Sequence, residues 1–204
     1  MLDPAPLPLL VLPEYVLLPG TLVPFHATEA APQRLFGAAL ADRRLLVVAG
    51  TPMPSIAALG RIVSDRRYPD GCIDVFVHAL ERVRVVDVSA GPDGLVARVA
   101  SAPDVAESRA TRAAGQRLRR LAIELAAVLG AADRGEEAEA LRAVAGSTPI
   151  CGLLANRLGS QLVLDPIERQ RLLETDCPAE RAERLVRRLG ELMLASARSD
   201  AALH

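Results

Sequence analysis

The chain has 204 residues, half of them hydrophobic and 24% charged, and its 24 basic and 25 acidic residues leave a formal net charge of −1. This composition excludes a disordered chain and is typical of a globular protein with one large or two small domains. The balanced charge gives no general attraction to nucleic acid or to an anionic membrane. Every basic residue is arginine, which excludes a P-loop lysine, a lysine Schiff base and a Ser-Lys dyad.

The N-terminus and the cysteines indicate a cytoplasmic protein without cofactors. No apolar run approaches the ~20 residues that cross a bilayer. The apolar N-terminus has no basic start and no cleavage site, so we expect no signal peptide. Cys72, Cys151 and Cys177 are widely spaced and form no CxxC motif. We therefore expect three reduced thiols, with neither a zinc site nor a disulfide framework.

The first fifty residues predict short strands and one helix. Residues 7–12 suit a first or edge strand, and the prolines at 13, 19 and 24 divide the following apolar segment into extended pieces. A stripe of apolar residues after Pro32 predicts a helix over about 31–43. Residues 45–49, LLVVA, form a continuous apolar run, which predicts a strand buried on both faces.

Residues 59–88 are the most informative stretch and predict a β-hairpin. Pro69-Asp70-Gly71 supplies a preset φ, a side chain that can bond its own backbone and a residue that tolerates positive φ. A second strand follows this turn, and we expect a third to leave through the charged step Glu81-Arg82. With a last strand at 95–100, short strands joined by turns predict a closed or nearly closed barrel over residues 1–103.

After residue 103 the hydrophobic period changes from two to 3.6, which predicts helices. We expect five helices. The first two cover about 105–129 and 136–145, and the third runs from a Thr148-Pro149 cap to about 158. The fourth follows a capping box at 165–168, and the last begins near 178. The predicted fold class is therefore α+β, with a β-barrel carrying one helix at 1–103 and an α-helical bundle at 104–204.

The sequence predicts no catalytic and no metal-ligating residues. Cys72, Asp74 and His78 fall on one face of a predicted strand. At ~3.3 Å per residue the outer two lie about 20 Å apart, and Asp74 and His78 about 13 Å apart. We interpret them as part of a polar outer strand face.

Two surfaces remain as candidate binding sites. The segment before the first helix is more apolar than a surface loop normally is, and suits an unfolded or extended polypeptide held by apolar contacts or strand addition. Its residues are Leu17, Leu18, Leu22, Val23, Pro24 and Phe25. The other interpretation, which the apolar character of the segment favours, is that these residues line the barrel or its junction with the bundle. The alternative is a nucleic-acid face on the last helix, formed by Arg184, Arg187 and Arg188 in a row with Arg181. The balanced charge, the few aromatic residues and the neighbouring glutamates favour a solvated helix face instead.

Three stretches carry a resemblance to a known family. They are LPLLVLPEYVLLPGTLVPF at 7–25, the hairpin LGRIVSDRRYPDGCIDVFVHALERVRVVDV at 59–88, and TPICGLLANRLGSQLVLDPIERQRLLETDCPAERAERLVRRL at 148–189. In this order they resemble the N-terminal, substrate-binding domain of ATP-dependent Lon protease. The resemblance implies a PUA-like β-barrel followed by a helical bundle.

The resemblance also implies a function. Without a Walker A motif or a lysine, neither ATP hydrolysis nor the family's Ser-Lys peptidase chemistry can reside in this polypeptide. The chain is similar to free-standing Lon-domain proteins. This resemblance implies a non-catalytic substrate-recognition module that binds unfolded or extended polypeptide or docks a partner protein, in connection with a proteolytic system. A PUA-like RNA-binding protein that uses the arginine-rich helix faces is the alternative.

Overall fold

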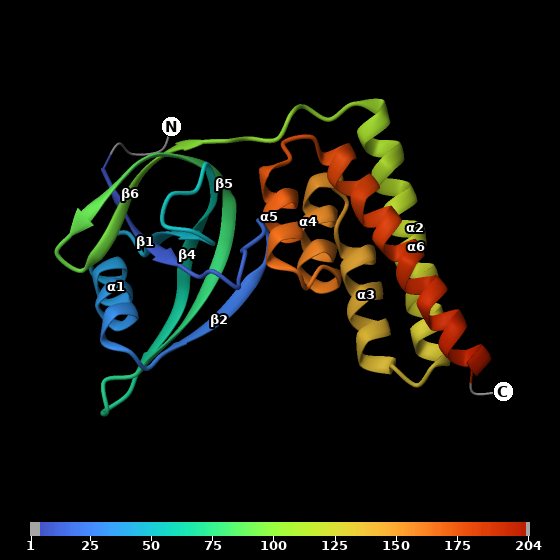
Figure 1. Ribbon diagram of the computed structural model, residues 1–204, viewed down its shortest axis with the longest axis horizontal. Helices are drawn as coiled ribbons and strands as arrows, with labels where there is room; N and C mark the ends of the chain where they lie inside the picture. The colour runs from blue at the N-terminus through green and yellow to red at the C-terminus, as the bar shows by residue number, and fades with distance from the viewer. Residues whose placement is uncertain (1–4, 203–204) are drawn as a thin grey trace. The chain divides into compact units, whose positions relative to one another are not determined.

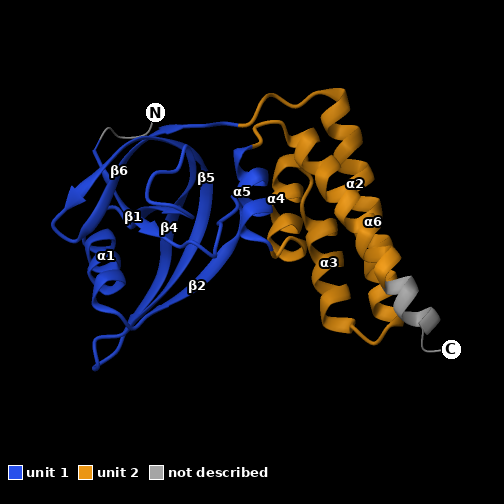
Figure 2. Cartoon of the chain, viewed as in Figure 1, with its two compact units in different colours: residues 1–103, 165–174 blue, residues 104–164, 175–204 orange. Residues whose placement is uncertain are grey.

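The computed structural model describes residues 5–202, with the side chains of residues 5–195. Within that range the protein has a mixed α+β fold, with a six-stranded sheet and six helices (Figure 1). It divides into two compact units (Figure 2). Unit 1 comprises residues 1–103 and 165–174, and unit 2 comprises residues 104–164 and 175–204.

Unit 1 contains all of the described strands and two helices. They are β1 (Leu7–Val11), β2 (Leu22–Ala27), α1 (Ala30–Ala41), β3 (Leu45–Ala49), β4 (Ile56–Arg67), β5 (Ile73–Gly91), β6 (Gly94–Ser101) and α5 (Pro166–Glu174). The sheet order is β2-β5-β4-β3-β1-β6, and β6 also pairs with β5. The pairings of β5, β4, β3, β1 and β6 therefore close on themselves, while β2 lies beside β5 alone among the described strands.

The predicted strand buried on both faces is confirmed as β3. Leu46 and Val48 belong to one hydrophobic cluster, together with Phe36 of α1. Val47 and Ala49 belong to a second cluster. The continuous apolar run is explained because successive side chains of a strand point to opposite faces, and here each face meets a core.

The turn of the predicted hairpin is confirmed. Gly71 has a φ of 90°, and the backbone N–H of Cys72 donates to Oδ1 of Asp70 at 3.0 Å. The prediction of a separate third strand was wrong, because β5 runs without a break from residue 73 to residue 91. The charged step Glu81-Arg82 continues the ladder opposite Leu59 and Ala58 of β4. A register shift between Leu59 and Gly60 accommodates it.

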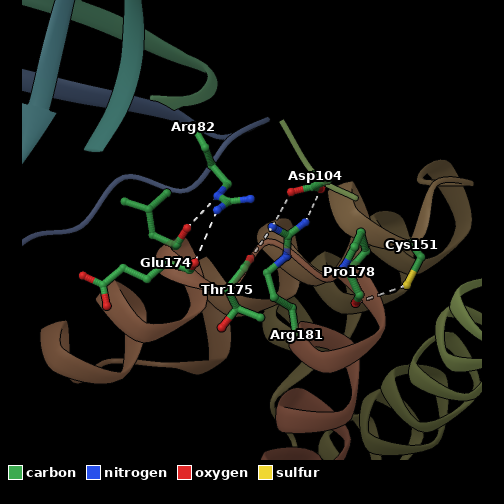
Figure 3. Close-up of polar contacts among 8 residues, drawn as sticks. Arg82, Asp104, Cys151, Glu174, Thr175, Pro178 and Arg181 are labelled. Carbon is green, nitrogen blue, oxygen red and sulfur yellow. Dashed lines mark hydrogen bonds and ion pairs between the residues drawn. The ribbon is translucent and has the colours of Figure 1, made fainter. Parts of the chain in front are cut away.

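Helix α5 belongs to unit 1, although the sequence grouped it with the other C-terminal helices at 104–204. Arg82 of β5 is buried and donates to the backbone oxygens of Leu173 at 2.6 Å and of Glu174 at 3.3 Å (Figure 3). A cation at the end of α5 is stabilised by the carbonyls that have no partner within the helix and by the helix dipole. Gln170 adds a bond from its side-chain amide to the backbone oxygen of Ile56 in β4, at 3.1 Å.

Unit 2 contains four helices. They are α2 (Arg109–Ala131), α3 (Gly135–Ser147), α4 (Cys151–Leu162) and α6 (Pro178–Ala202). Helix α2 begins later than predicted, because Ser108 and Thr111 form a reciprocal capping box. Helix α4 begins at Cys151 with Ile150 as N-cap. The predicted Thr148-Pro149 cap was therefore wrong.

Thr148 is buried and is the C-cap residue of α3 instead of the N-cap of α4. Its hydroxyl accepts a hydrogen bond from Arg157 at 3.1 Å, and its carbonyl accepts one from Arg119. Arg119 also donates to the carbonyl of Ala145 at 2.8 Å. The polar groups of this connection are thus satisfied by long arginine side chains, which the local cap pattern does not reveal.

An ion pair with a buried arginine connects the start of α6 to the segment that leads into α2. Arg181 is 1% exposed and forms a bidentate ion pair with Asp104, with Nη1 of Arg181 2.7 Å from Oδ1 of Asp104 (Figure 3). The same Nη1 donates to the carbonyl of Thr175 at 3.0 Å. A Cβ at Gly152 would lie 2.7 Å from the Asp104 carboxylate, so only glycine lets α4 approach this pair. The pair therefore joins a desolvated guanidinium to a carboxylate that keeps 33% of its side-chain surface exposed.

We expect Arg82→Met to destabilise the protein by about 2–4 kcal/mol, because two carbonyls at the end of α5 lose their donor. Urea unfolding followed by circular dichroism measures this change. Arg84→Met is the matched control: Arg84 lies two positions away on β5 and is exposed, so its change should stay within about 0.5 kcal/mol. Equal effects of the two variants would contradict the role given to Arg82.

We expect Asp104→Ala to cost about 3 kcal/mol of stability, because it leaves the Arg181 guanidinium buried without its carboxylate. The double variant Asp104→Ala with Arg181→Met removes both charges and should be more stable than Asp104→Ala alone. Thermal and urea unfolding test this order. Glu183→Ala serves as control, since its pair with Arg117 is solvent-exposed at 3.5 Å, and should change stability by less than about 1 kcal/mol.

Candidate functional site

Strands β2, β5 and β4 present one side to solvent, because their alternate residues face the core of unit 1. Val75 and Val77 of β5 and Ile62 of β4 are buried, and Val23 and Phe25 of β2 pack against the same cluster. The residues between them form three rows across the strands, which we call the three-strand face. The rows are Leu22, His78 and Arg61; Pro24, Phe76 and Ser64; and His26, Asp74 and Arg66.

The three-strand face carries an apolar patch. Leu22 is 57% exposed and Phe76 43% exposed, and Pro24, paired with Phe76, is also exposed. Val63 follows buried Ile62 at a register shift in β4 and is 50% exposed. Single exposed apolar residues are common, but Leu22, Pro24 and Phe76 lie on adjacent paired strands, and Val63 lies at the register shift next to them. Together they form a patch of the kind that marks an interaction site.

The free edge of β2 is poorly suited to strand addition. The strand has six residues, pairs with β5 on one side and carries Pro24, which has no backbone N–H. Short edge strands with a proline are a common protection against the pairing of further strands. The three-strand face therefore offers side-chain contacts more readily than it offers a backbone ladder.

A hydrogen-bonded network closes one end of the face. Nδ1 of His26 lies 2.5 Å from Oδ1 of Asp74, and the hydroxyl of Tyr68 donates to Oδ2 of Asp74 at 2.6 Å. The Tyr68 hydroxyl, followed by His26, lowers the pKa of the Asp74 carboxyl below its ordinary value. The same hydrogen bond raises the pKa of Tyr68 above its ordinary value. Asp74 is thus an anion held by two donors, one from β2 and one from the hairpin turn.

These groups provide binding chemistry. With both carboxylate oxygens of Asp74 already accepting bonds, the network orients the His26 ring at the border of the apolar patch. Among the residues that the structure describes, no group of three or more His, Cys, Asp or Glu side chains could hold a metal ion. Cys151 is buried, which raises the pKa of its thiol to about 11 and keeps it in the unreactive protonated form at neutral pH.

Two members of the predicted apolar patch are buried in the structure. Leu17 and Leu18 are each 1% exposed, so neither can contact a ligand at the surface. They lie in the segment between β1 and β2, where proline breaks allow extended backbone to fold over a core. Val23 and Phe25 face the core of unit 1. Leu22 and Pro24 are the members of the predicted patch that lie on the three-strand face.

The predicted arginine row on α6 is divided by the structure. Arg181 is buried against Asp104, and Arg188 pairs with Glu191 at 3.2 Å. Arg184 and Arg187 are exposed. Helical spacing places these residues near one another, but it does not show which of them are engaged by carboxylates within the protein.

The sequence did not associate His26 with Asp74, and it did not single out Phe76, Val63, Arg61 or Arg66. It grouped Asp74 with His78 and Cys72 on one strand, whereas the partner of Asp74 comes from 48 residues earlier in the chain. The alternation of β5 was a usable signal, since Asp74 and His78 were predicted on one strand face and Phe76 lies midway between them in the same alternation. Which residues of β2 and β4 lie beside these side chains is determined by the strand register, which the sequence alone does not show.

The fold and the three-strand face define an α+β protein whose exposed apolar patch lies on a sheet. Residues 6–191 match the ATP-dependent protease La (LON) substrate-binding domain, and the chain belongs to this family. Membership supports a role in substrate recognition. None of the described helices is long and apolar enough to cross a membrane.

Two solved structures show the same fold. The N terminal domain of Mycobacterium avium complex Lon protease superposes with a TM-score of 0.71 at 21% identity, over 91% of this chain and 98% of that one. A Lon N-terminal domain protein from Xanthomonas campestris superposes with a TM-score of 0.63, also at 21% identity, over 89% of this chain and 97% of that one. No curated protein sequence matches the chain.

We expect Tyr68→Phe to raise the pKa of Asp74 toward the ordinary value near 3.9, because it removes the first cause of the shift. Since the folded pKa is lowered, the network contributes stability above about pH 4 and loses it as pH falls through the folded pKa. Carbon-13 NMR of the Asp74 carboxyl group against pH measures the change. In Tyr15→Phe, as control, the Asp74 titration should not move; a similar shift in both variants would contradict the assignment.

Proposed function

We propose that this protein is a non-catalytic substrate-recognition module that binds extended or unfolded polypeptide on the three-strand face. The observation that supports the proposal most is the apolar patch of Leu22, Pro24, Phe76 and Val63 on a sheet whose other side is a packed core. A rigid strand face can contact alternate side chains of an extended chain without itself changing shape.

The contacts are apolar and shallow, which suits a broad range of sequences. Removing the apolar surface of Phe76 and Leu22 from water contributes favourable binding free energy, and it requires no particular hydrogen-bond pattern in the partner. The short, proline-containing edge of β2 favours this mode over strand addition. Recognition of unfolded chains requires such tolerance, because specificity for one sequence would exclude most substrates.

The proposal includes the finer fold predicted from the sequence. The strand pairings that close from β5 through β4, β3, β1 and β6 support a PUA-like barrel in unit 1. The four helices of unit 2 support a helical bundle. Both assignments go beyond the mixed α+β fold itself.

We expect Phe76→Ser to weaken binding of a permanently unfolded model protein, such as reduced carboxymethylated lactalbumin, about fivefold. The ring is already about half buried, so its remaining burial in a complex is worth about 1 kcal/mol. Leu22→Ser should act similarly, and the double variant should bind more weakly than either. Fluorescence anisotropy of the labelled unfolded protein measures the affinity.

Val86→Ser is the matched control. Val86 lies on β5 ten residues beyond Phe76 and is 65% exposed, so its replacement removes exposed apolar surface from the same strand outside the face. Affinity should then remain unchanged. Loss of binding in Val86→Ser alone, or none in Phe76→Ser with Leu22→Ser, would refute the proposed site.

A further inference from the structure

We infer that the three-strand face selects extended segments in which an apolar residue is flanked by acidic residues two positions before and two positions after it. This inference rests on the proposed function and adds its preferred substrate class. It assigns Arg61 and Arg66 of β4 as the residues that determine the preference.

Arg61 and Arg66 mark the two outer rows of the face. Arg61 is aligned with His78 of β5, and Arg66 with Asp74. Both arginines are exposed. The row between them holds Phe76, the largest side chain of the apolar patch.

Neither arginine side chain forms an ion pair within the described part of the chain. The Arg61 side chain makes no hydrogen bond or ion pair there, and the Arg66 guanidinium lies 4.9 Å from the centre of the Tyr68 ring without an ion pair. The Asp65 carboxylate is engaged elsewhere, whereas the Asp74 anion lies in the same row as Arg66 and attracts it. Asp74 accepts from His26 and Tyr68, and Asp65 pairs with Arg44 at 2.7 Å.

The spacing of the rows sets the spacing in the partner. Asp74 and His78, which mark the outer rows, are four residues apart on β5, or about 13 Å at ~3.3 Å per residue. An extended polypeptide lying along β5 has the same rise, so residues four positions apart reach both rows. The residue midway between them then faces Phe76. Acidic side chains at the outer positions would pair with the arginines, while basic ones would be repelled, most strongly at Arg61, whose row holds no carboxylate.

Three synthetic peptides test the inference on the full chain. Each carries a central phenylalanine, with glutamate, glutamine or lysine at the second position on either side, and is otherwise identical. At low salt we expect the glutamate peptide to bind about fivefold more tightly than the glutamine peptide, and the lysine peptide more weakly than both. At 0.5 M salt the differences should shrink, because exposed charges are screened.

The double variant Arg61→Glu with Arg66→Glu should reverse the order, so that the lysine peptide binds best. Its matched control is Arg84→Glu with Arg98→Glu, which changes the net charge of unit 1 equally at exposed positions outside the face. That control should keep the original order. Reversal in both double variants would assign the preference to net charge and overturn the inference.

The two proposals fail in distinguishable ways. If the glutamine peptide binds and Phe76→Ser weakens it, but glutamate and lysine peptides bind equally, the acidic preference is wrong and the polypeptide site stands. If the glutamine peptide binds no better than background, or binds independently of Phe76, the proposed function itself is wrong. A preference for the lysine peptide in the unmodified protein would also overturn the inference.

Discussion

The register of β5 is the constraint on which unit 1 depends. This single strand of 19 residues pairs with β2, β4 and β6, and its side chains alternate between a core and a surface. Val75, Val77 and Val83 are buried. A slip of one residue would move every one of them to the opposite face and would expose the core. The same register sets the surface, since it decides that Phe76 lies beside Pro24 and that Asp74 lies beside His26.

Within each unit, a buried arginine fixes the position of a segment through hydrogen bonds, in addition to apolar packing. Arg82 in unit 1 and Arg181 in unit 2 each bring a guanidinium out of water, which is unfavourable unless its donors are used. Arg82 places its donors on carbonyls at the end of α5, and Arg181 places its donors on Asp104 and the carbonyl of Thr175. Nε of Arg181 has no hydrogen-bond partner. These contacts specify geometry, because a planar guanidinium bonds well only in a narrow range of orientations.

Sequence patterns predicted local structure well where the cause is local. The turn at residues 69–71 followed from the conformational needs of its glycine and aspartate, and β3 followed from an apolar run too short for a helix. They failed where the cause is distant. Glu81-Arg82 marked a break in the pattern, yet the strand continues because Arg82 meets carbonyls 91 and 92 residues away. Leu17 and Leu18 were as apolar as Leu22, and nothing in their neighbours distinguishes core from surface.

The sequence by itself determined the α+β class, most of the elements, the family and the exclusion of lysine chemistry, because these depend on composition, periodicity and residue identity. Only the tertiary structure decided that α5 belongs with the strands of unit 1. It alone brought His26 to Asp74 and aligned Arg61, Phe76 and Arg66 on one surface. Periodicity shows that a residue has a buried or an exposed side, whereas strand register and helix docking decide what lies next to it. A binding surface is defined by such neighbours.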